Sequence, residues 1–115
     1  MSLRYGIIIT VAIVLGLNLI SHAEEQAAVN IKLFTFKPNA IEVKEGTTVT
    51  WTNGDAIDHS VTNGTPEKPG DAFDSGFFTE GKSFSFTFTK AGEYPYFCKR
   101  HNSMMGTVKV VPAPH

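Results

Sequence analysis

The sequence predicts an all-β protein, an antiparallel sandwich or barrel of about seven or eight short strands. Apolar and polar side chains alternate with a period of two from residue 29 onward, which is the pattern of strands with one buried face. Turn dipeptides such as Asn-Gly and Pro-Asn separate the alternating segments. No window after residue 23 has helical periodicity, so a helical fold is not expected.

The first predicted strand departs from simple alternation. Ile31 and Leu33 point to one face, whereas Phe34 and Phe36 follow with an odd spacing. We expect either a β-bulge that redirects the strand at Phe34 or a segment that is covered on both faces. The next alternating segment, residues 41–44, is a short strand with turn signals at both ends.

Three later segments supply the predicted core. Trp51 lies in an alternating strand that ends at an Asn-Gly turn, and we expect this side chain to be buried. Residues 65–71 are rich in proline and polar side chains and are expected to form a loop. The alternation assigns to buried faces Val49 and Trp51, then Phe84, Phe86 and Phe88, and finally Val108 and Val110.

Composition limits the classes of function. The chain has 115 residues, enough for one small domain. Its net charge of −1 argues against a nucleic-acid binder, because such proteins carry an excess of basic residues on one face. A single cysteine excludes an intramolecular disulfide.

The N-terminal segment has the features of an export signal. A positively charged start precedes an apolar run over residues 6–20, and small residues follow at Ser21 and Ala23. The run is shorter than the ~20 residues that a transmembrane helix needs. We expect residues 1–23 to be cleaved, which leaves one periplasmic domain over residues 24–115. The alternative is an uncleaved signal, which would be the only membrane attachment.

Sulfur and imidazole side chains are concentrated just after the predicted strand 93–97. Cys98, His101, Met104 and Met105 lie within eight consecutive residues. Thiolate and thioether donors beside imidazole are typical of a copper site.

A second histidine has to come from elsewhere in the chain. His59 follows the strand that ends at Asn53, whereas His115 is the terminal residue and a weak candidate. A sandwich fold can bring that strand end beside the loop that follows Phe97. Two histidines, one cysteine and a weak axial methionine form a blue-copper electron-transfer site.

The chain resembles the small cupredoxins of the plastocyanin, pseudoazurin and amicyanin group. The resemblance implies a Greek-key β-sandwich of about eight strands that holds one type 1 copper ion. It implies as copper ligands His59, Cys98, His101 and a methionine. The two-residue gap between His101 and Met104 is similar to the short ligand loop of amicyanin. The matching stretches are residues 36–53, 58–61, 88–94 and 98–108.

Only one of the adjacent methionines can face the metal, because consecutive strand residues point to opposite faces. Counting back from Val108 and Val110 puts Met104 on the core face. The family pattern of an axial methionine, one variable residue and then glycine favours the same residue. We therefore expect Met104 to be the weak axial ligand and Met105 to be a packing or surface residue.

Two positions depart from the family pattern. Arg100 stands where many relatives have a proline, and Ser60 stands where many have an asparagine that ties the two ligand loops together. The backbone N–H of Ser60 can still reach the cysteine sulfur. We expect Asp55 and Asp58 to be solvated. Lys99 and Arg100 are either solvated loop charges or a docking patch beside the copper.

The expected function is that of an exported electron carrier that cycles between Cu(II) and Cu(I), not of an enzyme. The resemblance implies that redox proteins dock transiently near the exposed edge of His101. We expect a monomer with no nucleic-acid partner and no small-molecule substrate. The alternative is a copper trafficking or storage module with the same ligands. A Cys–His hydrolase is disfavoured. Hydrolytic thiols lie at helix N-termini or in open clefts, whereas Cys98 comes at the end of a strand in a small chain.

Overall fold

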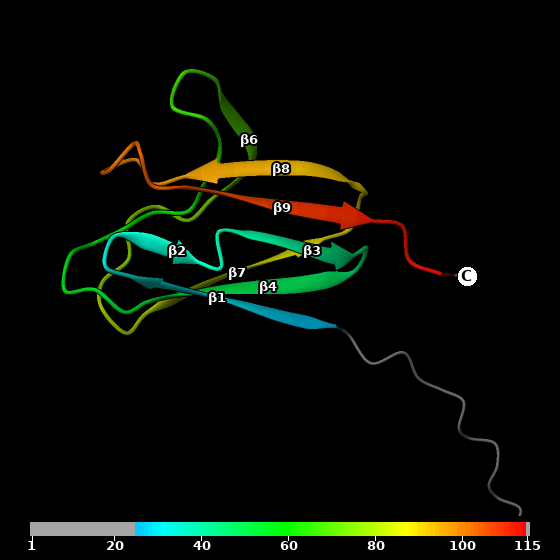
Figure 1. Cartoon of the computed structure of the whole chain (residues 1–115), viewed down its shortest axis with the longest axis horizontal. Helices are drawn as coiled ribbons and strands as arrows, with labels where there is room; N and C mark the ends of the chain where they lie inside the picture. Colours follow the sequence, from blue (N-terminus) through cyan, green and yellow to red (C-terminus); the bar gives the residue numbers. More distant parts are fainter. Residues whose placement is uncertain (1–24, 115) are drawn as a thin grey trace, which may run out of the picture.

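A computed structural model describes residues 25–114, which form two β-sheets packed as a sandwich (Figure 1). The sheets have the strand orders β2-β1-β4-β7 and β3-β9-β8-β5-β6. No helix long and apolar enough to cross a membrane occurs in this part of the chain. The export signal expected in residues 1–23 and the terminal His115 lie outside the described residues. The strands are β1 (Gln26–Lys32), β2 (Thr35–Lys37), β3 (Ala40–Lys44), β4 (Thr47–Asn53), β5 (Thr62–Gly64), β6 (Pro69–Asp74), β7 (Ser83–Phe88), β8 (Gly92–Phe97) and β9 (Met105–Val111).

The connections cross repeatedly between the two sheets. β1 pairs with β4 and β3 pairs with β9 in parallel, whereas β4–β7 and β8–β9 are antiparallel. This order is that of a Greek-key sandwich, so the predicted all-β class is confirmed. The β1–β2 turn, the segment after β4 and the β8–β9 loop consequently lie at the same end of the molecule (Figure 1).

The core lies between the sheets and is largely aromatic. Residues of β4 alternate between buried and half-buried, and Trp51 is fully buried as expected. Its ring contacts aromatic rings from both sheets, with Phe88 on β7 and Tyr96 on β8 among them. Burying one such side chain stabilises the fold by about 1.5–3 kcal/mol. The core cluster contains Val29, Ile31, Phe36, Val49, Trp51, Val61, Phe73, Phe88, Tyr96, Cys98, Met104, Val108 and Val110.

The expectation for the first strand was wrong. Residues 26–37 form neither a bulged strand nor a strand covered on both faces, but a hairpin in which Ile31 lies opposite Phe36. Leu33 and Phe34 form its two-residue turn, with φ angles of 54° and 58°. Positive φ at both turn residues is the geometry of a type I′ hairpin, for which Asn-Gly is the usual signal. Because two apolar residues replace that signal here, the sequence pattern alone predicts a strand at this turn.

The predicted loop over residues 65–71 is shorter than expected. β6 begins at Pro69 and forms the edge of its sheet, a position where proline is tolerated. The side chain of Asn63 supports the β5–β6 pair, because its Oδ1 accepts from Ala72 N at 3.1 Å and its Nδ2 donates to Pro95 O at 3.1 Å. With the first hairpin, this edge strand gives nine strands among the described residues, where about eight were expected.

Candidate metal centre

His59 is held at one end of the sandwich by backbone pairing outside the named strands. It forms an isolated bridge with Phe78: Phe78 N donates to His59 O at 2.9 Å, and His59 N donates to Phe78 O at 3.3 Å. Its side chain is fully buried. The segment between β4 and β5 therefore has a fixed backbone at the position where it presents the imidazole.

The β8–β9 loop is closed on itself by two backbone hydrogen bonds. Cys98 N donates to Met104 O at 3.0 Å, and Met104 N donates to His101 O at 2.8 Å. These bonds bring both ends of the loop together between two paired strands. The three sequence-predicted residues of the loop are therefore presented from one compact turn.

The fold brings His59, Cys98 and His101 together. One potential ligand atom from each of the three lies within 4.8 Å of the others, and Cys98 Sγ is 3.7 Å from His59 Nδ1. His59 and Cys98 are completely buried, whereas His101 is partly exposed. The His101 Nδ1 atom is nevertheless buried and has no hydrogen-bond partner among the described residues. Buried polar atoms normally have a partner, so this nitrogen is suited to a metal ion.

The donor set fits copper. Two imidazoles and one thiolate are the strong donors of a trigonal copper site, and a thioether completes it as a weak axial donor. Met104 is 4% exposed and packs in the core cluster with Cys98, whereas Met105 is 51% exposed. The alternation expected from Val108 is thus observed, and Met104 belongs to the same buried cluster as Cys98.

Ser60 connects the two segments that carry the candidate ligands. Its backbone N–H donates to Cys98 Sγ at 3.4 Å, as the sequence predicted. Its side chain also accepts a hydrogen bond from Lys99 N at 2.9 Å. The shorter serine therefore ties the loops together through its hydroxyl group. Lys99 itself is paired with Asp74 at 2.6 Å at the surface.

The expectation that Asp55 is solvated was wrong. Asp55 is 8% exposed, and its Oδ2 atom accepts a hydrogen bond from His59 Nε2 at 2.9 Å. Burial raises the pKa of this carboxyl, but hydrogen bonds from Phe34 N, Leu33 N and His59 outweigh burial and hold the pKa below its ordinary value. Metal-ligating histidines commonly donate their second N–H to a carboxylate, so an acidic residue near His59 was a usable signal in the sequence. Asp58, in contrast, is only half-buried.

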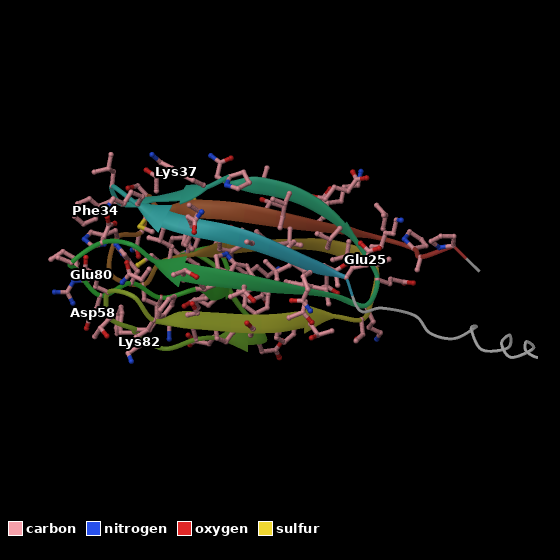
Figure 2. All side chains as sticks on the ribbon, turned by 90° about the horizontal axis from the view of Figure 1, so that it is seen from below. Glu25, Phe34, Lys37, Asp58, Glu80 and Lys82 are labelled. Carbon is pink, nitrogen blue, oxygen red and sulfur yellow. The ribbon has the colours of Figure 1, made fainter. Side chains whose placement is uncertain are left out.

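Exposed apolar side chains occur at the end of the sandwich that holds His101. The ring of Phe34 stands edge-on to the rings of His101 and His59, with centroid distances of 4.9 Å and 5.5 Å. Leu33, Phe34, Ile57 and Phe77 are exposed and belong to segments at this end of the sandwich. Figure 2 shows Phe34 and Asp58 at this end and Glu25 at the opposite end. We call these four exposed residues the apolar rim, and of them Phe34 contacts both histidines of the site.

Comparisons with known proteins give the family. A family model described as copper binding proteins, plastocyanin/azurin family, matches residues 23–111, and the chain belongs to this family. Amicyanin of Paracoccus versutus is 33% identical over 86 residues, which are 75% of this chain and 65% of that relative's length. Plastocyanin of Scenedesmus fuscus is 35% identical over 83 residues, covering 65% of this chain and 85% of the relative.

Solved structures of the same fold are also similar. A purple cupredoxin from Nitrosopumilus maritimus aligns with a TM-score of 0.69 at 30% identity, covering 74% of this chain and 99% of the other. A reduced amicyanin variant aligns with a TM-score of 0.66 at 32% identity, covering 73% of this chain and 80% of the other. The chain is therefore a copper-binding cupredoxin and not an enzyme.

Proposed function

We propose that His59, Cys98 and His101 bind one copper ion, that Met104 is its weak axial ligand, and that the protein carries single electrons between redox proteins. The observation that carries the proposal is the convergence of three ligand atoms within 4.8 Å, one of them the buried, unpartnered Nδ1 of His101. Bound copper supplies one-electron chemistry between Cu(II) and Cu(I).

The surrounding residues keep the proposed ligands in place. His59 and Cys98 are excluded from water, and the sulfur accepts a backbone hydrogen bond from Ser60. Because the segments are joined by hydrogen bonds, little has to move when the charge at the site changes. A rigid, water-free site is favourable for electron transfer, since few groups have to reorganise.

The electron port in this proposal is the partly exposed His101. Its ring lies at the apolar rim, where Phe34 contacts it at a centroid distance of 4.9 Å. An apolar rim is suited to brief contact with redox proteins, because it excludes water without binding a small substrate. The protein acts as a monomer in this proposal.

Export to the periplasm is part of the same proposal. Residues 1–23 have the order of a signal peptide, and the family match begins at residue 23. Cleavage after Ala23 would leave residues 24–115 as the copper domain. N-terminal sequencing of the protein from a periplasmic extract tests this; a start at Met1 would contradict it.

A copper trafficking or storage role is less well supported. Transfer of copper by ligand exchange requires that an incoming ligand reach the metal, which buried ligands hinder. Cys98 and His59 are both completely buried. Rapid, reversible electron exchange of the copper-loaded protein at an electrode supports the carrier, whereas redox silence combined with copper transfer would support the alternative.

The visible absorption spectrum tests the copper assignment. We expect the oxidised, copper-loaded protein to have an intense charge-transfer band in the red, because the Cys98 thiolate is a direct ligand. Cys98→Ser removes the band, since a hydroxyl group stays protonated and is a poor copper donor. Met105→Leu is the matched control, because Met105 is exposed, and it keeps the band. A coloured Cys98→Ser protein would refute the assignment.

A further inference from the structure

One buried carboxylate links a candidate copper ligand to a turn 21 residues earlier in the chain. Asp55 Oδ2 accepts from His59 Nε2 and from Phe34 N, both at 2.9 Å, and Oδ1 accepts from Leu33 N at 2.8 Å. We propose that Asp55 is a positioning residue that orients His59 toward the copper and fixes the Leu33–Phe34 turn over the same site. The orientation of His59 toward copper rests on the proposed function, whereas the hydrogen bonds of Asp55 are independent of it.

The carboxylate selects the tautomer of His59. An ionised carboxylate only accepts hydrogen bonds, so the hydrogen of the neutral imidazole resides on Nε2. The Nδ1 lone pair then faces the thiol, and Nδ1 accepts from Cys98 Sγ at 3.7 Å. A carboxylate partner also makes the imidazole a stronger donor to a metal. Asp55 thus prepares the one nitrogen of His59 that faces the thiolate.

The turn needs Asp55 because its residues are unsuited to its backbone. Leu33 and Phe34 have φ angles of 54° and 58°, a left-handed conformation that glycine and asparagine adopt more readily. Their backbone N–H groups both donate to the Asp55 carboxylate. Hydrogen bonds to an ionised acceptor are stronger than neutral ones, and they hold the turn despite its side chains.

The side chains of this turn indicate why the arrangement is useful. Phe34 is 48% exposed, and its ring stands edge-on to both histidines of the site. An Asn-Gly turn would form without Asp55 but would leave no ring over His101. The carboxylate that orients His59 therefore also sets the aromatic cover at the edge of the site.

Asp55 has a rigid support. Its backbone N–H donates to Asn53 Oδ1 at 2.8 Å. Asn53 is fully buried, and its Nδ2 donates to Ile57 O at 2.9 Å and to Phe78 O at 3.0 Å. The carboxylate is consequently anchored from the end of β4, on the same segment that carries His59.

The test compares Asp55→Asn with Asp58→Asn, which removes the same charge from the same loop at a half-buried site. In Asp55→Asn, one amide oxygen cannot serve all three donors. We expect nitrogen NMR of the copper-free protein to show a mixture of the Nε2–H and Nδ1–H tautomers of His59, where the natural protein has the Nε2–H tautomer alone. In the loaded protein, we expect copper affinity to fall about 10- to 100-fold, the reduction potential to rise and the spin-resonance spectrum to change. Asp58→Asn leaves the tautomer and affinity unchanged.

A redesigned turn distinguishes a role of Asp55 in orienting His59 from a role in stabilising the fold alone. In the background of Leu33→Asn and Phe34→Gly, the turn no longer depends on Asp55, so Asp55→Asn remains folded and costs less stability than in the natural chain. The changes in the His59 tautomer and in copper affinity persist there. Tautomer and affinity equal to those of Asp58→Asn in either background would overturn the proposal. The tautomer of His59 is measured without copper, so it tests the positioning role alone. The Cys98→Ser spectrum tests the copper assignment, so the two proposals can fail separately.

Discussion

Gly106 allows β9 to pass over a buried aromatic ring just after the ligand loop. Gly106 lies opposite Tyr96 in the β8–β9 register. A methyl group at this position would overlap the Tyr96 ring, approaching the hydroxyl oxygen to 2.5 Å and the Asn39 carbonyl oxygen to 2.9 Å. We therefore expect Gly106→Ala to destabilise the protein.

The size of the effect follows from how tightly the ring is held. Tyr96 is 1% exposed and packs edge-on against Phe36 and Trp51, at centroid distances of 4.7 Å and 5.3 Å. Overpacking of this kind costs about 1–3 kcal/mol. Without such overlap, Gly→Ala would stabilise the protein by about 0.4–1 kcal/mol, because it lowers the conformational entropy of the unfolded chain. Because backbone also blocks the methyl group, we expect a net loss of about 2 kcal/mol, or roughly 10 °C in Tm.

Urea unfolding of the copper-free protein measures this loss. Lys109→Ala is the control, because Lys109 is exposed on the same strand. Combining Gly106→Ala with Tyr96→Leu removes the overlapping ring, so the two changes together should cost less than the sum of the single changes. The packing explanation would be refuted if Gly106→Ala had the same free energy of unfolding as the natural protein. It would also be refuted if the losses of the two single variants added up to the loss of the double variant.

Three further predictions concern the surroundings of the site. Met104→Leu should raise the reduction potential and alter the spin-resonance spectrum, whereas Met105→Leu should do little; the opposite result would reverse the axial assignment. Charge reversal at Lys99 and Arg100 should lower the rate of electron transfer with an acidic partner and reduce its salt dependence, while the copper spectrum stays the same; rates independent of ionic strength would make both residues ordinary solvated charges. Burial raises the pKa of Asp74, but hydrogen bonds, first that from Lys99, outweigh it and lower the pKa below its ordinary value. The stability that Asp74 contributes is therefore present at neutral pH and lost as the pH falls through the lowered pKa, so Asp74→Asn should flatten the acid limb of the stability curve, and an unchanged acid limb would contradict this.

The sequence by itself determined the strands in which apolar and polar side chains alternate, and it determined the candidate ligands of the site. Trp51 and Phe88 could be placed in the core because a strand has a local period of two that any reader of the sequence can count. Cys98, His101 and Met104 could be recognised together because they belong to one loop, so their chemistry is visible as spacing. The choice of Met104 over Met105 used the phase of one strand together with the family pattern of an axial methionine, one variable residue and then glycine.

Contacts between segments distant in the sequence were decided by the tertiary structure. The Leu33–Phe34 turn contains no turn signal, because its left-handed backbone is stabilised by Asp55 from another loop and not by its own residues. For Asp55, the sequence offered the nearby His59 as one partner, but Leu33 and Phe34 become its neighbours only when β1 and β4 pair. The bond from Lys99 N to the Ser60 hydroxyl group likewise forms between loops 39 residues apart. Local periodicity fixes which way a side chain points, but the packing of the two sheets determines what it meets.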